Sequence, residues 1–304
     1  MAPTIAGDTS GSSTTPAGTG VAQAFARGNA NDVEHAVEQH YARGNLEDAI
    51  LHALAASGKD IDHLVPSDLS PVDEFHTGAR QATIDLAARL DFRADMHILD
   101  IGCGIGGPSR YLAETRGCRV MGVDLTPSFV DTATALARRV GLADLVQYRQ
   151  ASALNLPFDD GTFDGAWMLH VGMNIEDKAR LFREVRRVVA RGGRLGLFDV
   201  MRIGDGDLAF PLPWATAPAT SFVETPQAYR TALGEAGFDV TGERDRRDFA
   251  LAYMAEMKAR AAAGGPPSLG VHVLIVDAPA KMANYAGLVE RRIAAPVEMV
   301  CRAR

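Results

Sequence analysis

The sequence has few cysteines, no long apolar run and no excess of basic residues, and each absence excludes a class of protein. Its three cysteines, Cys103, Cys118 and Cys301, lack metal-type spacing, so reduced thiols are expected. No apolar run approaches the length of a membrane span, and the first residues lack the basic-then-apolar order of a signal peptide. The formal net charge of −7 argues against nucleic acid as the main partner. A cytoplasmic protein with no nucleic-acid or membrane partner is predicted.

The order of apolar and polar segments predicts the fold class. Residues 1–25 are rich in Ser, Thr, Gly, Ala and Pro and are expected to be a disordered tail, whereas residues 26–304 are expected to form one domain. Apolar periodicity predicts strands at 96–101, 119–123, 146–150, 163–168, 194–200 and 296–303. Helices are predicted at 31–57 (with a break near Gly44), 71–90, 107–115, 128–140, 176–189 and 226–236. This alternation predicts an α/β, doubly wound parallel sheet, whose ligands bind at the carboxyl ends of the strands.

The most informative stretch is a predicted strand that ends in alternating glycines, Gly102, Gly104 and Gly106. Glycine lets backbone N–H groups approach a ligand at the start of the next helix. The following predicted strand ends in Asp124, at the spacing of a carboxylate that binds ribose hydroxyls. Asp100 precedes the glycines, where its charge would oppose a pyrophosphate but suit the ammonium group of an amino acid. The pattern indicates a nucleoside joined to an amino acid.

These motifs resemble those of the class I S-adenosylmethionine-dependent methyltransferases, over residues 70–245. The glycine loop looks closest to the branch with sterol, tocopherol, sugar O-methylating and sarcosine/dimethylglycine enzymes. The resemblance implies a Rossmann-like, seven-stranded sheet with an antiparallel last strand, an N-terminal helical cap over 31–70 and a helical insertion over about 248–293. It also implies S-adenosylmethionine as cofactor, a small-molecule methyl acceptor as partner and no metal. We expect a monomer or a homodimer.

The same resemblance assigns the residues of the cofactor site. Asp124 is expected to bind the ribose diol, and Leu125 to lie against the adenine. Relatives often have Asp-Ala after the third strand, where this chain has Ser152 and Ala153. The serine hydroxyl would accept the bond from the adenine amino group more weakly than a carboxylate. Other residues expected around the methionine part of the cofactor are Leu169, Gly78, Gln81 and Tyr41.

The candidates for chemistry stand at the ends of the fourth and fifth predicted strands. His170 can take a proton from an acceptor, and Asp199 can orient the histidine or bind the acceptor; a purely structural role for either residue is the alternative. His76 and His272 are weaker candidates. The acceptor pocket is expected among side chains that could equally pack a core: Trp214, Phe222, Tyr253 and Met254.

Three functions remain open from the sequence. The first is methyl transfer to a small molecule, with oxygen or nitrogen favoured over carbon or sulfur as the methylated atom. The second is a nicotinamide-dependent dehydrogenase, against which Asp100 and the absence of a Tyr-x-x-x-Lys pair count. The third is a non-catalytic protein that binds S-adenosylmethionine and acts on a partner.

Overall fold

The strands in the described part of the chain form one seven-stranded sheet. The computed structural model describes residues 1, 30–41, 46–264, 269–270 and 275–304. In these residues the sheet order is β3-β2-β1-β4-β5-β7-β6, with β7 antiparallel to both neighbours. The strands are β1 (His97–Ile101), β2 (Arg119–Asp124), β3 (Val146–Gln150), β4 (Phe163–Leu169), β5 (Val189–Arg202), β6 (Phe238–Asp245) and β7 (Ala294–Ala303). The expected seven-stranded sheet with an antiparallel last strand is thus confirmed.

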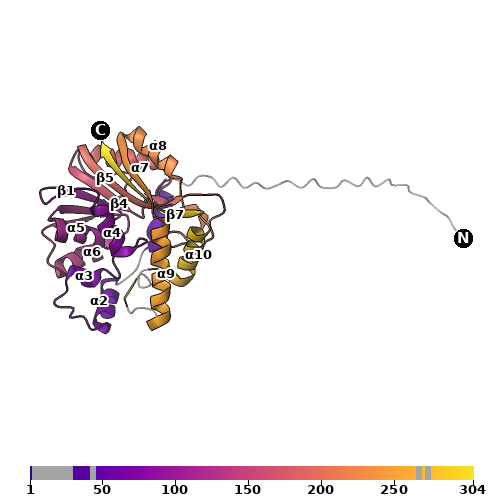
Figure 1. Cartoon of the computed structure of the whole chain (residues 1–304), viewed down its shortest axis with the longest axis horizontal. Coiled ribbons are helices and arrows are strands. Elements are labelled where there is room, and N and C mark those ends of the chain that lie inside the picture. Colours follow the sequence, from indigo (N-terminus) through magenta and orange to yellow (C-terminus); the bar gives the residue numbers. More distant parts are fainter. Residues whose placement is uncertain (2–29, 42–45, 265–268, 271–274) are drawn as a thin grey trace.

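Helices cover both faces of the sheet and its carboxyl edge (Figure 1). They are α1 (Ala30–Tyr41), α2 (Leu46–Ala56), α3 (Pro66–Leu69), α4 (Ala79–Ala87), α5 (Gly107–Arg116), α6 (Pro127–Arg139), α7 (Lys178–Val188), α8 (Pro226–Ala236), α9 (Arg247–Gly264) and α10 (Ala278–Glu290), with 3₁₀ turns η1 (Gly172–Asn174) and η2 (Pro218–Thr220). Within the described ranges, every helix is too short or too polar to cross a bilayer. The predicted tail over 1–25 and His272 lie outside the described residues.

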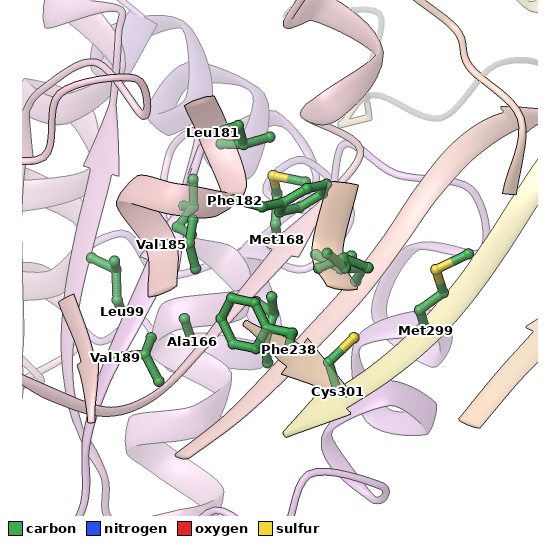
Figure 2. Close-up of a cluster of buried hydrophobic side chains, with 14 of the residues drawn as sticks. Leu99, Ala166, Met168, Leu181, Phe182, Val185, Val189, Phe238, Met299 and Cys301 are labelled. Atoms are coloured by element: carbon green, nitrogen blue, oxygen red, sulfur yellow. The ribbon is translucent and has the colours of Figure 1, made fainter. Parts of the chain in front are cut away.

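Side chains of the central strands point alternately to the two faces of the sheet, so each packs against the helices of one face. Ala166 and Met168 of β4 pack into the core beneath α7 and α8, where Phe182 and Val185 are fully buried (Figure 2). Trp167, between them, packs on the other face with α4 and α5. Successive side chains of a strand point to opposite faces of the sheet. The position of each polar residue along β1 and β5, odd or even relative to its buried neighbours, therefore decides which face it points to; we call this its parity.

Strand β6 was not predicted from the sequence, and the helix predicted over 71–90 begins later than expected. The edge strand β6 is mostly exposed and highly charged, so it shows no apolar run. The buried Glu298 of β7 anchors it, accepting a 2.6 Å hydrogen bond from Arg244 of β6 and a 3.1 Å bond from Arg246. The predicted helix over 71–90 begins only at Ala79, because residues 72–78 form a buried polar loop instead.

Candidate active site

The loop between β1 and α5 has the conformation that its glycines permit. Gly102, Gly104 and Gly106 have φ values of 68°, 53° and 85°, a left-handed region that side chains disfavour. A Cβ on Gly102 would lie 2.3 Å from a methyl group of Val171, and one on Gly106 would lie 2.2 Å from the Tyr148 hydroxyl. Glycine is therefore required at these two positions for space as well as for backbone geometry.

Asp124 ties this loop to the end of β2. Its carboxylate accepts hydrogen bonds from the backbone N–H of Gly104 and of Thr126, both at 2.9 Å. Burial raises the pKa of Asp124, and these two backbone bonds oppose that shift. Asp124 also lines the cavity described below. An acceptor here suits a pair of neighbouring hydroxyl groups.

A cavity of about 580 Å³ opens above the carboxyl ends of the strands. Its volume lies within the range of small-molecule sites. Twelve of the residues singled out by the sequence line it: Tyr41, His76, Gly102, Gly104, Asp124, Leu125, Ala153, Leu169, His170, Trp214, Tyr253 and Met254. The cavity thus brings together residues from the glycine loop, from α1 and from α9.

Asp100 and Asp199 are not among the described residues that line the cavity, and their expected contacts with ligands stay predictions. Asp100 lies on the α5 face of β1, where the Ser109 hydroxyl donates to it at 2.5 Å, and burial raises its pKa to about 7. Asp199 has the parity of Leu197 and therefore faces α8, where the Tyr229 hydroxyl donates to it at 2.6 Å. Burial raises the pKa of Asp199 to about 6.

Five further expected residues also fall outside the described lining. Gly78 packs against Phe249, whose ring would lie 2.2 Å from an added Cβ. Gln81 is exposed and donates to Asp85 at 2.8 Å. Phe222 holds its loop in place through the backbone, donating to the Met173 carbonyl at 2.7 Å. The last two positions, Gly106 and Ser152, flank the cavity without lining it.

His170 occupies a backbone position that non-glycine residues rarely adopt, with φ of 54°. Its ring stacks on Phe198, with centroids 5.0 Å apart, and meets the His76 ring edge-on at 6.0 Å. The His170 Nε2 atom is buried, and no described residue hydrogen-bonds to it. Burial, together with His76, holds the pKa of His170 well below its usual range, and burial lowers that of His76 to about 4. Both imidazoles are therefore neutral at pH 7.

Several lining residues escaped the sequence analysis because they come from segments without a motif. Asn174 of η1 accepts from the Tyr41 hydroxyl at 3.3 Å and donates to the carbonyl groups of Trp214 and Thr220. The hydroxyls of Thr77 and Tyr285 lie 3.0 Å apart, joining the 72–78 loop to α10. Other cavity residues that were not anticipated are Glu34, Ile175, Glu176, Asp177 and Met282.

The residues present fit S-adenosylmethionine. Gly102 and Gly104 place bare backbone against the cavity, Asp124 offers an acceptor for a ribose, and Leu125 and Phe129 offer apolar surface for a base. In the described parts of the chain, no group of three or more His, Cys, Asp and Glu side chains could hold a metal ion.

Comparisons with known proteins agree with this geometry. Residues 99–197 match the family described as "Methyltransferase domain". The methyltransferase GfsG of Streptomyces halstedii is 31% identical over 57% of this chain and 63% of its own length. The chain therefore spans less than two thirds of that relative. The geranyl diphosphate C-methyltransferase of Streptomyces coelicolor has the same fold, with 19% identity and a TM-score of 0.64 over 90% of this chain and 98% of that one.

The O-methyltransferase resE of Aspergillus sclerotiorum is 31% identical to this chain, over 60% of this chain and 69% of its own length. A likeness of this extent, together with the domain match, shows common descent, and this chain belongs to the class I S-adenosylmethionine-dependent methyltransferases.

Proposed function

We propose that this protein transfers the methyl group of S-adenosylmethionine to an oxygen or nitrogen atom of a small, largely apolar acceptor. The observation that carries the proposal is the continuity of one cavity. It runs from Asp124 and the backbone of Gly102 past His170 to apolar side chains of α9, including Tyr253 and Met254. The relative resE, an O-methyltransferase, supports oxygen as the methylated atom.

Binding and orientation are the main tasks of the chain in this reaction. The cofactor supplies an activated methyl group together with its leaving group. Asp124 and the backbone of Gly102 and Gly104 hold the nucleoside, which fixes the direction in which the methyl group points. The apolar walls around Trp214 and Met254 exclude water and align the acceptor for in-line displacement.

His170 is the proposed proton acceptor. Its imidazole is neutral, it lines the cavity, and its buried Nε2 has no partner among the described residues. A hydroxyl acceptor must lose a proton on methylation, and an unprotonated imidazole can take it. Asp199 does not take the proton in this scheme, because Tyr229 and the backbone N–H of Val200 hold it on the other side of β5. Its role there is to hold the end of β5 in position.

Calorimetry with S-adenosylhomocysteine, on the wild type and on Asp124→Ala, tests the proposal first. We expect micromolar binding that is lost in the variant. Incubation with methyl-labelled S-adenosylmethionine and a panel of phenols, aliphatic alcohols and amines then tests turnover. Absence of binding, or tight binding of a nicotinamide dinucleotide, would overturn the proposal. Binding without turnover on the whole panel would favour the non-catalytic alternative. The family membership already argues against the dehydrogenase.

A further inference from the structure

Glu34 brings a carboxylate to the cavity from α1, a helix outside the sheet. Glu34 lines the cavity, and its Oε1 accepts a hydrogen bond from the Ser152 hydroxyl on the loop after β3. At the other end of α1, Tyr41 also lines the cavity and donates to Asn174 of η1. Hydrogen bonds at both ends of α1 therefore hold the helix across the cavity.

The sheet order locates Glu34 relative to the two ends of a bound cofactor. Asp124 ends β2, which lies between β3 on one side and β1 and β4 on the other. His170 follows β4, so a ligand with its ribose at Asp124 and its reacting end at His170 must place its base on the β3 side. Ala153 and Glu34 line the cavity on that side.

Ser152 is the weaker of the two acceptors that face the base. Its hydroxyl donates its one proton to Glu34 and accepts from the backbone N–H of Leu154 at 3.0 Å, which leaves a single neutral lone pair. Glu34 can accept more and stronger hydrogen bonds, because an ionised carboxylate has about four lone-pair sites and its Oε2 has no hydrogen-bond partner among the described residues. The stronger acceptor for a purine amino group is therefore on α1 rather than on the loop after β3.

We propose that Glu34 recognises the 6-amino group of the cofactor's adenine, with Ser152 as the positioning residue that orients its carboxylate. The inference rests on the proposed function, because it takes S-adenosylmethionine as the ligand. It extends that function by assigning base specificity to α1, so that the helix covering the cavity also distinguishes an amino group from an oxygen on the purine.

Two probes separate this role from a structural one: S-adenosylhomocysteine and its deaminated analogue S-inosylhomocysteine, which carries a carbonyl oxygen in place of the amino group. We expect the wild type to prefer the adenosyl compound by about 10- to 100-fold, the value of a hydrogen bond to a charged group. Glu34→Gln should reduce that preference by about tenfold or more, because the amide can donate to the carbonyl oxygen. Calorimetry gives the ratio of the two dissociation constants.

Glu38→Gln, one helical turn along α1, is the matched control, since Glu38 is not among the described lining residues. Its preference should equal that of the wild type. Ser152→Ala should lower the preference by a smaller factor than Glu34→Gln. An equal loss of affinity for both probes in either site variant would indicate a structural role and overturn its assignment.

Failure of the proposed function and failure of the role of Glu34 give different results. If the wild type binds neither probe, the proposed function fails. If the wild type binds and prefers the adenosyl compound while Glu34→Gln keeps the same preference, only the role of Glu34 is overturned. A wild type without preference overturns that role as well, because no group then recognises the amino group.

Discussion

The Tyr229 hydroxyl donates a 2.6 Å hydrogen bond to the Asp199 carboxylate, on the α8 face of β5. The next strand residue toward the amino end, Phe198, has the opposite parity and stacks on the ring of His170. Two residues that are neighbours in sequence thus serve different sides of the sheet. Asp199 secures the end of β5 to α8, while Phe198 supports the histidine of the cavity.

Asp199→Asn should change how the free energy of unfolding depends on pH. The raised pKa of about 6 means that the favourable, protonated form contributes fully below the unfolded value near 3.8 and that this contribution is lost as the pH rises through 6. Asparagine keeps an acceptor for Tyr229 but does not titrate. Relative to wild type, the variant should therefore gain up to about 3 kcal/mol in free energy of unfolding between pH 4 and pH 8. Chemical denaturation at the two pH values measures this gain, and equal differences would contradict it.

His170→Asn should lower kcat by about 100-fold or more for a hydroxyl acceptor. Asparagine tolerates the φ of 54° that His170 adopts, so the backbone is not strained, but it cannot take a proton. The dissociation constant of S-adenosylhomocysteine should stay within about threefold of the wild type, well under the tenfold worth 1.4 kcal/mol. Steady-state kinetics and calorimetry give the two quantities, and an unchanged kcat would assign His170 a structural role.

The rate of methyl transfer should not change with pH near 6.5, the usual pKa of a histidine, on account of His170. Burial holds the pKa of His170 well below 6.5, so the imidazole stays unprotonated from pH 8 down to pH 6. We expect kcat/KM with a hydroxyl acceptor to be level over this range. A fall centred near pH 6.5 that disappears in His170→Asn would show that the histidine is more solvated than the structure indicates.

Gly106→Ala should destabilise the fold more than Gly141→Ala. Both glycines have positive φ, 85° and 70°, but an added Cβ at Gly141 meets nothing within 4 Å, whereas at Gly106 it lies 2.2 Å from the Tyr148 hydroxyl. Backbone strain alone costs about 1 kcal/mol, and overpacking adds about 1–3 kcal/mol. Urea denaturation compares the two variants, and equal midpoints would contradict the packing argument.

Met254→Glu should raise KM for the acceptor by about tenfold or more while leaving binding of S-adenosylhomocysteine unchanged. Met254 lines the cavity from α9, and a charge there must be desolvated when an apolar acceptor binds. Met257→Glu is the control: this residue is three positions along the same helix and is not among the described lining residues. Equal changes in KM for the two variants would place the acceptor elsewhere.

Local motifs predicted the cofactor half of the cavity lining, and the alternation of side chains along the strands explains why Asp100 and Asp199 are absent from it. The glycines and Asp124 follow one another within a single strand-loop-helix-strand unit, so their spacing alone brings them together. Asp100 and Asp199 also stand near strand ends, which made them look like ligand contacts. Their alternation with buried neighbours, such as Leu197 and Met201 around Asp199, already indicates that they face a helix layer.

The rest of the site could not be read from the sequence because it depends on tertiary contacts. Glu34, Asn174 and Tyr285 come from α1, η1 and α10, and none of them belongs to a recognisable pattern. The edge strand β6 was missed for a related reason: its Arg244 pairs with Glu298 on β7, a partner far along the chain.

The two halves of the cavity draw on separable parts of the chain. Gly102, Gly104, Asp124 and Glu34 lie before residue 130, whereas Trp214, Tyr253, Met254, Met282 and Tyr285 all lie beyond residue 210. Figure 1 shows α9 and α10 side by side at one flank of the sheet, away from α5 and α6. With the acceptor bound as proposed, substitutions in the C-terminal third would change acceptor preference and leave the residues proposed to hold the cofactor unchanged.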